Sequence, residues 1–389
     1  MNLMLFVGAG LLGFSFSLAC VPLSSRISKY VRAVDHPVPE KVHRTPMPRL
    51  GGLAIYLGFW LSVFVLYLVY GEALGSFGRQ IQGLLIGSSL ILSIGILDDI
   101  FGLGAWVKLF VEIAAAVIVV SFGYRMLPAG SLGFIGGAGE VVVLLGSIIW
   151  IVWVTNVFNL ADGLDGLAAG IGGIVSLSIM VLGLSLGVPW VGLLSIILFG
   201  VCTGFLVHNF PPARIFMGDS GSLFLGFTFA SVIMGVAGVD GGHGISLLGI
   251  LALGVPMIDG IGAVLRRLIN RQSVMKGDRD HLHYKLLLRN GSRRKVALVI
   301  YLMTVGFSGL SLLIYFKFNG HGPMLALAST CVAAVLVVKR FRLLELYISR
   351  YHLLPGKSIS GFLLDEGEEV RAAASKTARK EQETLAPIP

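Results

Sequence analysis

Long apolar segments recur along nearly the whole chain, and they constrain its fold more than any other feature. Most are close to the roughly 20 residues that an α-helix needs to cross a bilayer. Of the 389 residues, 55% are hydrophobic and only 13% are charged, whereas a soluble domain has about 25% charged residues. The segments lack the alternation typical of a transmembrane β-barrel. The sequence therefore predicts an all-α, polytopic integral membrane protein.

About eleven membrane spans are predicted, near residues 2–22, 51–70, 81–97, 107–124, 141–159, 167–186, 190–208, 221–239, 245–264, 296–316 and 323–338. Residues 1–338 are expected to form one transmembrane domain. The tail, 339–389, begins with FRLLELYISRYHLL, whose apolar residues recur at helical spacing. We expect that part to lie in the membrane interface and the charged, Ala-rich end to be disordered.

The basic residues predict the orientation of these spans. The first apolar segment has no basic residue before it, which indicates a retained span with its N-terminus outside. On that assignment, all but three of the 30 Lys and Arg residues lie in or beside cytoplasmic segments; the exceptions are Arg79, Arg125 and Lys317. This bias agrees with the positive-inside rule and predicts a cytoplasmic C-terminus.

The aspartates gather on the same predicted face. Ten of the eleven Asp residues lie in or beside a predicted cytoplasmic loop or the tail, and only Asp240 does not. Carboxylates at a membrane boundary are costly and mark functional sites. Hard Mg²⁺ takes oxygen ligands and usually arrives with a phosphate, and Lys or Arg neutralises the remaining charge. The sequence thus predicts a site for a cation and a phosphate at the cytoplasmic ends of the spans.

Two short motifs place acids at span ends. LDDIFG contains adjacent Asp98 and Asp99, which repel unless a cation or a proton intervenes; a solvated turn would account for them equally well. HNFPPARIFMGDSGS places Asp219 at the start of a span, where free N–H groups and the helix dipole favour phosphate. An ordinary N-cap would explain Asp219 but not Asn209, Arg214 and Phe216 around it.

The segment NVFNLADGLDG places four polar side chains at the end of the fifth predicted span. If the helix continues, Asn156, Asn159 and Asp162 share one face, and Asp165 follows three residues later. Amides can read a nucleobase edge, whereas capping of the helix would need only one such residue. We expect the missing cations to be Mg²⁺ and Lys or Arg from 23–50 and 265–295.

Two basic loops and one intramembrane acid complete the candidate site. VDHPVPEKVHRTPMPRLGG combines prolines with Lys41, His43 and Arg49, which favour an anionic ligand, although a positive-inside loop would look similar. DRDHLHYKL places His281 and His283 two residues apart, which is not the helical zinc spacing and fits a phosphate clamp with Arg279. Asp259 lies near the inner end of a span without an evident partner, while Glu112 could pair with Lys108 one turn earlier.

In order, these motifs resemble the polyprenyl-phosphate N-acetylhexosamine-1-phosphate transferases over roughly residues 30–290. The N-x-x-N-x-x-D-G-x-D-G and M-G-D-x-G-S segments carry the resemblance most specifically. The DRDHLH form is most similar to the undecaprenyl-phosphate N-acetylglucosamine-1-phosphate transferase branch. That branch usually has His-x-His-His, and here Tyr284 takes the last place, so the sugar stays open.

The resemblance implies transfer of HexNAc-1-phosphate, foremost GlcNAc-1-phosphate, from UDP-HexNAc to polyprenyl phosphate with release of UMP. It implies a Mg²⁺-dependent enzyme (Mn²⁺ being an alternative) of the bacterial plasma membrane that starts cell-envelope glycan synthesis, with its active site on the cytoplasmic face, and a homodimer. The implied catalytic residues are Asp98, Asp99, Asp219, His281 and His283, with Asp219 and Asp99 as metal ligands. The implied substrate-binding residues are Lys41, His43, Arg49, Asn156, Asn159, Asp162, Asp165, Asn209, Phe216, Asp259 and Arg279.

Three alternatives remain at this point. A phospho-N-acetylmuramoyl-pentapeptide transferase or another UDP-sugar-specific member would share most of these motifs. A transporter would also carry intramembrane acids, but near the bilayer midplane between repeats. A membrane metallohydrolase would use the same acids and histidines to activate water.

Overall fold

The computed structural model describes residues 3–37, 45–74, 78–127, 130–237, 245–273 and 281–317, together with positions 328 and 332. The predicted tail, the rest of the predicted span at 323–338, and Lys41, His43 and Arg279 lie outside the described residues. The helices and the candidate site belong to one compact unit, residues 1–34 with 48–344. Of the other unit, residues 35–47 and 345–389, only 35–37 and 45–47 are described.

The described chain is predominantly helical. Its long helices are α1 (Leu3–Tyr30), α2 (Gly51–Leu74), α3 (Gly78–Phe101), α4 (Ala105–Ser121), α5 (Gly137–Ala161), α6 (Leu167–Ser185), α7 (Pro189–Asn209), α8 (Gly218–Ala237) and α12 (Arg293–Lys317). The shorter elements are β1 (Val34–Asp35), β2 (Met47–Pro48), the 3₁₀ helix η2 (Gly133–Ile135), α9 (Ile245–Ala252), α10 (Gly254–Ile269) and α11 (Leu282–Asn290). The two strands pair in one sheet.

The predicted pattern of membrane spans is confirmed in its main feature. Within the described ranges, eight helices are long and apolar enough to cross a membrane: α1, α2, α3, α5, α6, α7, α8 and α12. The predicted span at 107–124 coincides with α4, which has 17 residues. The protein is thus a polytopic helical membrane protein, while the number eleven and the orientation remain predictions.

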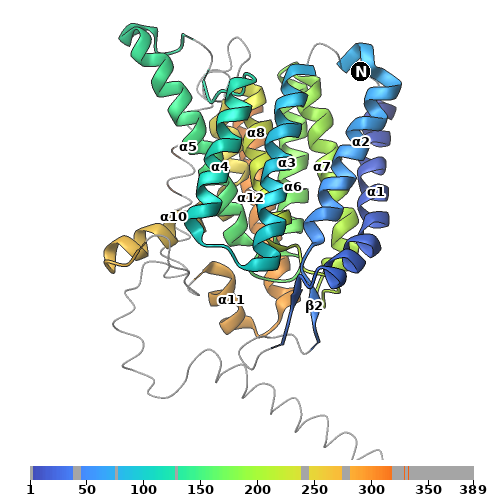
Figure 1. Cartoon of the computed structure of the whole chain (residues 1–389). Helices are drawn as coiled ribbons and strands as arrows, with labels where there is room; N and C mark the ends of the chain where they lie inside the picture. The colour runs from blue at the N-terminus through green and yellow to red at the C-terminus, as the bar shows by residue number, and fades with distance from the viewer. Residues whose placement is uncertain are drawn as a thin grey trace, which may run out of the picture. The chain divides into compact units, whose positions relative to one another are not determined.

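The predicted continuous span at 245–264 is wrong. The chain forms two helices there, α9 and α10, and the break falls at Leu253. Pro256 explains it, because in one uninterrupted helix its nitrogen would face the Ala252 carbonyl without an N–H to donate. Near the start of a new helix a proline costs little, and the ladder resumes when Met257 N–H donates to the Leu253 carbonyl at 3.1 Å. Figure 1 shows α10 projecting sideways from the other helices.

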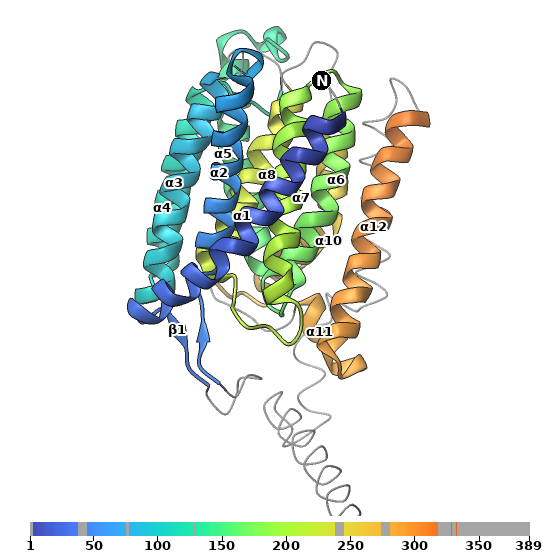
Figure 2. The same cartoon turned by 90° about the vertical axis from the view of Figure 1, so that its right-hand side faces the viewer.

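Small residues allow the helices to approach closely, as in other membrane bundles. The most extensive contacts join α7 to α1 and α6 and join α1 to α2, and the contacts of α8 with α3 and α5 come next. A Cβ added to Gly200 of α7 would stand 2.1 Å from the carbonyl oxygen of Gly10 in α1. Helix α8 lies in the middle of the bundle (Figures 1 and 2), and its Phe224, Phe227 and Phe229 are fully buried.

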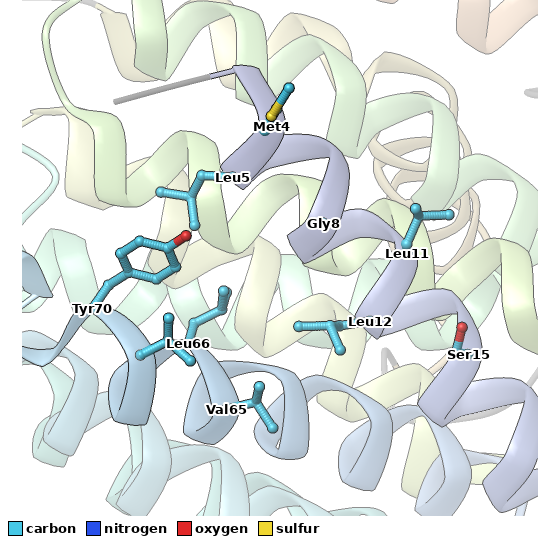
Figure 3. Close-up of a pocket in the computed structure, with 10 residues that line it drawn as sticks. Met4, Leu5, Gly8, Leu11, Leu12, Ser15, Val65, Leu66 and Tyr70 are labelled. Carbon is cyan, nitrogen blue, oxygen red and sulfur yellow. The ribbon is translucent and has the colours of Figure 1, made fainter.

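The two ends of the bundle differ in character. Figures 1 and 2 place α11 at the end where α3 turns into α4, opposite the first residues of α1. Near the N-terminal end of α1, a cavity of about 370 Å³ lies between α1 and α2 (Figure 3). Its lining is mainly apolar: Met4, Leu5, Gly8, Leu11, Leu12, Ser15, Val65, Leu66, Val69 and Tyr70. The titratable side chains singled out in the sequence do not line it, so we sought the functional site at the other end.

Candidate functional site

Asp99, at the end of α3, holds the beginning of α8. The backbone N–H groups of Asp219 and Ser220 each donate to the Asp99 carboxylate at 3.0 Å. These are among the N–H groups that the first turn of a helix leaves without an internal partner. Asp99 is buried, and the Arg49 guanidinium lies 3.5 Å from it. Asp99, at the end of the third predicted span, therefore fixes the start of α8, the helix that carries Asp219.

This junction requires glycine. Gly218 has φ +71, and a Cβ there would stand 2.1 Å from the Arg49 carbonyl oxygen and 2.4 Å from an Asp99 carboxylate oxygen. A Cβ on Gly95 of α3 would stand 2.5 Å from the Cα of Ser220. Both the positive φ and the close approach exclude larger residues. The glycines of MGDSGS and LSIGILDD are thus what lets α3 and α8 meet.

Lys108 of α4 lies between two of the predicted acids. Its ammonium donates to Asp219 Oδ2 at 2.7 Å and lies 3.4 Å from Asp98 Oδ2. The other oxygen of Asp98 accepts the Leu103 N–H at 2.8 Å, which closes the turn into α4. We define Asp98, Asp99, Lys108 and Asp219 as the acidic cluster. It contains three carboxyl groups and one ammonium, with Arg49 at its edge, so its acids outnumber its cations.

Lys108 belongs to the candidate site but was not among the residues predicted for it. Its signal was present, since it is a lone cation nine residues after the second of two adjacent aspartates at a predicted cytoplasmic boundary. The suggested pairing of Glu112 with Lys108 is wrong: Lys108 reaches Asp219, while the buried Glu112 accepts a hydrogen bond from Asn156 Nδ2. Lys108 and Glu112 are one turn apart in α4, but each of them bonds to a residue of another helix instead.

The acidic cluster is suited to a hard divalent cation. Among the residues described, no three His, Cys, Asp or Glu side chains are placed to hold one metal ion between them. Mg²⁺ does not need three, since it is usually bound through one or two carboxylates together with phosphates and water. Asp219 and Asp98 already share one cation, the Lys108 ammonium. Asp99 is less suited, because each of its oxygens accepts a backbone N–H.

The asparagines of NVFNLADGLDG connect helices. Helix α5 ends at Ala161, so Asp162 follows the helix instead of extending its face. Asn159 Nδ2 donates to Ser222 Oγ of α8 at 2.8 Å, and Asn156 bonds Glu112 of α4. The expected face of three polar groups is therefore divided between two neighbouring helices and the loop.

Asp162 lies close enough to the acidic cluster for the charges of the cluster to shift its pKa. Burial, and next the negative charges of Asp219 and Asp99, hold the pKa of Asp162 well above its ordinary range, with Arg49 opposing them. A carboxyl in such surroundings ionises readily only when a cation arrives. The loop 162–166 thus adds a fourth carboxyl on the side of the cluster.

The other end of this loop is tied by side chains. Asn209 Oδ1 accepts the Gly166 N–H at 2.9 Å, and its Nδ2 donates to the Ile215 carbonyl at 2.8 Å. Asp165 Oδ2 accepts Arg293 Nη1 at 2.8 Å and the Ala213 N–H at 3.2 Å. The expected cation from 265–295 is confirmed here for Asp165. Roles of Asn209 and Asp165 in binding a nucleotide stay predictions.

Asp259 contacts the segment that carries His281 and His283, which we call the histidine segment. Asp259 Oδ2 lies 3.0 Å from His281 Nδ1, and its other oxygen accepts the Leu282 N–H at 2.9 Å, at the start of α11. The rings of His281 and His283 are parallel, with centroids 5.7 Å apart. One buried acid therefore orients the first histidine and begins the helix that carries the second.

His283 lies against the loop 162–166. A Cβ added to Gly163 would stand 2.1 Å from His283 Nε2, and that buried nitrogen has no hydrogen-bond partner among the described residues. Burial lowers the pKa of His283 to about 4, the nearby Asp259 opposing and His281 adding to the shift. His283 is therefore neutral near pH 7, which does not suit a cationic phosphate clamp. The structure joins two motifs that are about 120 residues apart in the chain.

Phe216 and Arg49 are brought together by the backbone. The Phe216 N–H donates to the Pro48 carbonyl at 2.9 Å, and the Phe216 carbonyl accepts the Gly51 N–H at 3.0 Å. Phe216 is half-buried two residues before Gly218. Stacking of Phe216 on a base stays a prediction.

Comparison with known proteins shows which family the chain resembles. The model of glycosyl transferase family 4 matches residues 81–237, which contain the acidic cluster and the loop 162–166. A probable undecaprenyl-phosphate N-acetylglucosaminyl 1-phosphate transferase of Bacillus subtilis is 37% identical over 75% of this chain and 80% of its own length. A decaprenyl-phosphate N-acetylglucosaminephosphotransferase of Mycobacterium leprae is 34% identical over 81% of this chain and 86% of its own. An undecaprenyl-phosphate alpha-N-acetylglucosaminyl 1-phosphate transferase of Escherichia coli is 27% identical over 74% and 77%, respectively.

Proposed function

The chain belongs to the polyprenyl-phosphate N-acetylglucosamine-1-phosphate transferases of glycosyl transferase family 4, and from that premise we propose its reaction. It transfers GlcNAc-1-phosphate from UDP-GlcNAc to a polyprenyl phosphate, foremost undecaprenyl phosphate. The products are polyprenyl-diphospho-GlcNAc and UMP. The observation that carries this proposal is the meeting of Asp98, Lys108 and Asp219 at the N-terminus of α8.

The acceptor phosphate is the nucleophile in this reaction. One of its oxygens forms a bond to the sugar-bearing phosphorus, and the bond from that phosphorus to the bridging oxygen of UDP breaks. The bridging oxygen leaves with UMP. Such a transfer needs mainly alignment and neutralisation of charge. The second pKa of a phosphoester is near 6, so the nucleophile is largely ionised at neutral pH and a strong base is unnecessary.

The residues divide this task by their position. Lys108 supplies positive charge where phosphate groups meet. Mg²⁺, with Mn²⁺ as an alternative, would be held by Asp219 and Asp98, and it would neutralise the diphosphate of the donor. Asp99 keeps α8 in place. The loop 162–166, with Asn209 and Phe216, is proposed to bind the nucleotide.

The histidine segment is proposed to close the donor side of the site. His281 is oriented by Asp259, and it is the better candidate to contact the diphosphate or the sugar. The ring of His283 instead packs against Gly163 of the loop. We further propose that the active site faces the cytoplasm from the plasma membrane, as the distribution of Lys and Arg supports. A homodimer is part of the same proposal.

One assay tests the reaction against its rivals. Purified protein with Mg²⁺ is given a panel of UDP-HexNAc donors, including UDP-GlcNAc and UDP-N-acetylmuramoyl-pentapeptide, with and without polyprenyl phosphate. We expect UMP release that requires the lipid and is fastest with UDP-GlcNAc. Release without the lipid would indicate a hydrolase, preference for the muramoyl donor would move the chain to the other branch, and no release with any donor would favour a transporter.

A further inference from the structure

Three side chains from the first turns of α12 form hydrogen bonds to two loops at the proposed donor site, 162–166 and 210–217. Arg293 Nη1 donates to Asp165 Oδ2 at 2.8 Å, and the Tyr301 hydroxyl donates to the Gly166 carbonyl at 2.6 Å. Arg294 Nε donates to the Pro211 carbonyl at 2.7 Å. We define Arg293, Arg294 and Tyr301 as the α12 latch. All three belong to one stretch of helix, nine residues from first to last, so they move together.

Tyr301 is seated by packing as well as by its hydrogen bond. A Cβ added to Gly170 in α6 would stand 2.0 Å from the Cζ of Tyr301. The ring therefore lies directly on the backbone of α6, just after the loop 162–166. Because a Tyr side chain has few rotatable bonds, a ring held in this way fixes the position of its hydroxyl. The Gly166 carbonyl, at the end of the loop, is held by a rigid donor.

Arg293 compensates the charge of Asp165, whose carboxylate is almost fully buried. The Asp165 side chain is 8% exposed, and that of Arg293 is 26% exposed. Removing one partner of such a pair leaves a buried charge without compensation. The Ala213 N–H, at 3.2 Å, would then be the remaining donor described for Asp165. Loss of Arg293 should displace Asp165 and with it the loop between Asp162 and Gly166.

The latch makes no described contact with the acidic cluster and lies after the residues matched by the family model, 81–237. Resting on the proposed function, we propose that the α12 latch positions the loop 162–166 for the UDP part of the donor, and so sets donor affinity. Arg293 and Tyr301 are then positioning residues that act through Asp165 and Gly166. The affinity for the lipid acceptor should be unaffected by them.

The test compares Arg293→Met and Tyr301→Phe with Lys295→Met. Lys295 is an exposed cation two residues after Arg293, so its replacement removes the same charge from the same helix end. Binding of UDP-GlcNAc without lipid is measured by calorimetry on the full-length protein, and the KM values for donor and lipid are measured by UMP release. We expect donor affinity to fall about tenfold in Arg293→Met and about threefold in Tyr301→Phe. Lys295→Met should stay within twofold, as should every KM for lipid.

The proposal is overturned if Arg293→Met and Tyr301→Phe bind the donor as the wild type does. It is also overturned if the affinities for donor and lipid fall equally, because that is the result of a general structural defect. Tyr301→Phe decides alone if Arg293→Met does not fold, since it removes one oxygen and keeps the packing on Gly170. A wild type that binds UDP-GlcNAc without releasing UMP would contradict the proposed function, while the comparison of donor affinities would still decide the latch.

Discussion

The acidic cluster and the loop 162–166 lie on the same site but hold their charges in opposite ways. In the cluster, the carboxylates of Asp98 and Asp219 share one ammonium, that of Lys108. At the end of the loop, Asp165 has its own guanidinium and a backbone donor. The histidine segment follows the second pattern, because Asp259 pairs with His281. A region with surplus charge can receive a cation and a phosphate, whereas a region with paired charges keeps a fixed shape for recognition.

The largest expected effect comes from altering the region with surplus charge. Asp219→Asn removes the negative charge that lies 2.7 Å from Lys108, and we expect kcat to fall by about 10²–10³-fold. The thermal midpoint should change little, because the contacts of Asp99 with the α8 backbone persist. The measurement is UMP release at saturating substrates, with circular dichroism to verify folding. Near-wild-type turnover would show that the cluster is not the chemical centre.

Acid should lower the stability of the protein through His283, which belongs to the region with paired charges. Its pKa is lowered from 6.5 to about 4, which corresponds to about 3 kcal/mol. Because the folded state binds the proton less well than the unfolded state, this stability is fully present above pH 6.5 and is lost as the pH falls toward 4. The raised pKa of Asp162 acts in the opposite direction, so a comparison of variants is needed.

The measurement is the thermal midpoint between pH 4 and pH 7 for the wild type and for His283→Phe. Asp162 is common to both, so its effect cancels in the difference. We expect the midpoint of the wild type to decline more steeply with acid. Parallel curves would contradict a buried neutral imidazole at this position.

A smaller expected effect tests the contact between Gly163 and His283. The new methyl group of Gly163→Ala would stand 2.1 Å from His283 Nε2, so the loop or the imidazole must move. Overpacking of this kind costs about 1–3 kcal/mol, and we expect donor binding to weaken by a similar amount. Adding His283→Ala should restore part of the donor affinity measured by calorimetry. If the double variant binds no better than Gly163→Ala, the clash is not the cause.

The smallest effect is expected at an ion pair outside the site. Arg125 Nη1 lies 2.5 Å from Glu140 Oε2, with side chains that are 32% and 40% exposed. Pairs this exposed to solvent contribute little to stability, so Glu140→Gln should barely change the thermal midpoint and should leave both KM values unchanged. It is also the matched control for Asp219→Asn, since each exchanges one acid for its amide. A kinetic effect as large as that of Asp219→Asn would remove the distinction between the regions.

The sequence was most informative where its signals were local. Apolar length predicted the positions of the long helices, and the distribution of Lys and Arg put Asp98, Asp99 and Asp219 on one face, where the structure joins them. The break at Leu253 was also a local signal, in Pro256, but hydropathy alone concealed it.

The parts that were missed depend on contacts between distant segments. Lys108 was read against its neighbour Glu112, because spacing within a helix is visible and the approach of α4 to α8 is not. For the same reason the sequence could predict a cation for Asp165 from 265–295 without selecting Arg293. It could not show that His283 lies against Gly163, since glycine spacing does not reveal which side chain needs the room.

The pairing of Asp165 with Arg293 also has a consequence for biosynthesis. The two residues are 128 positions apart, so at ordinary elongation rates the ribosome makes the second on the order of 10 s after the first. During that interval the α3, α5 and α8 helices can already have assembled around the acidic carboxylates. The nascent protein would thus complete its chemical centre before its recognition loop is fastened, and competence to select a nucleotide would be acquired late in membrane insertion.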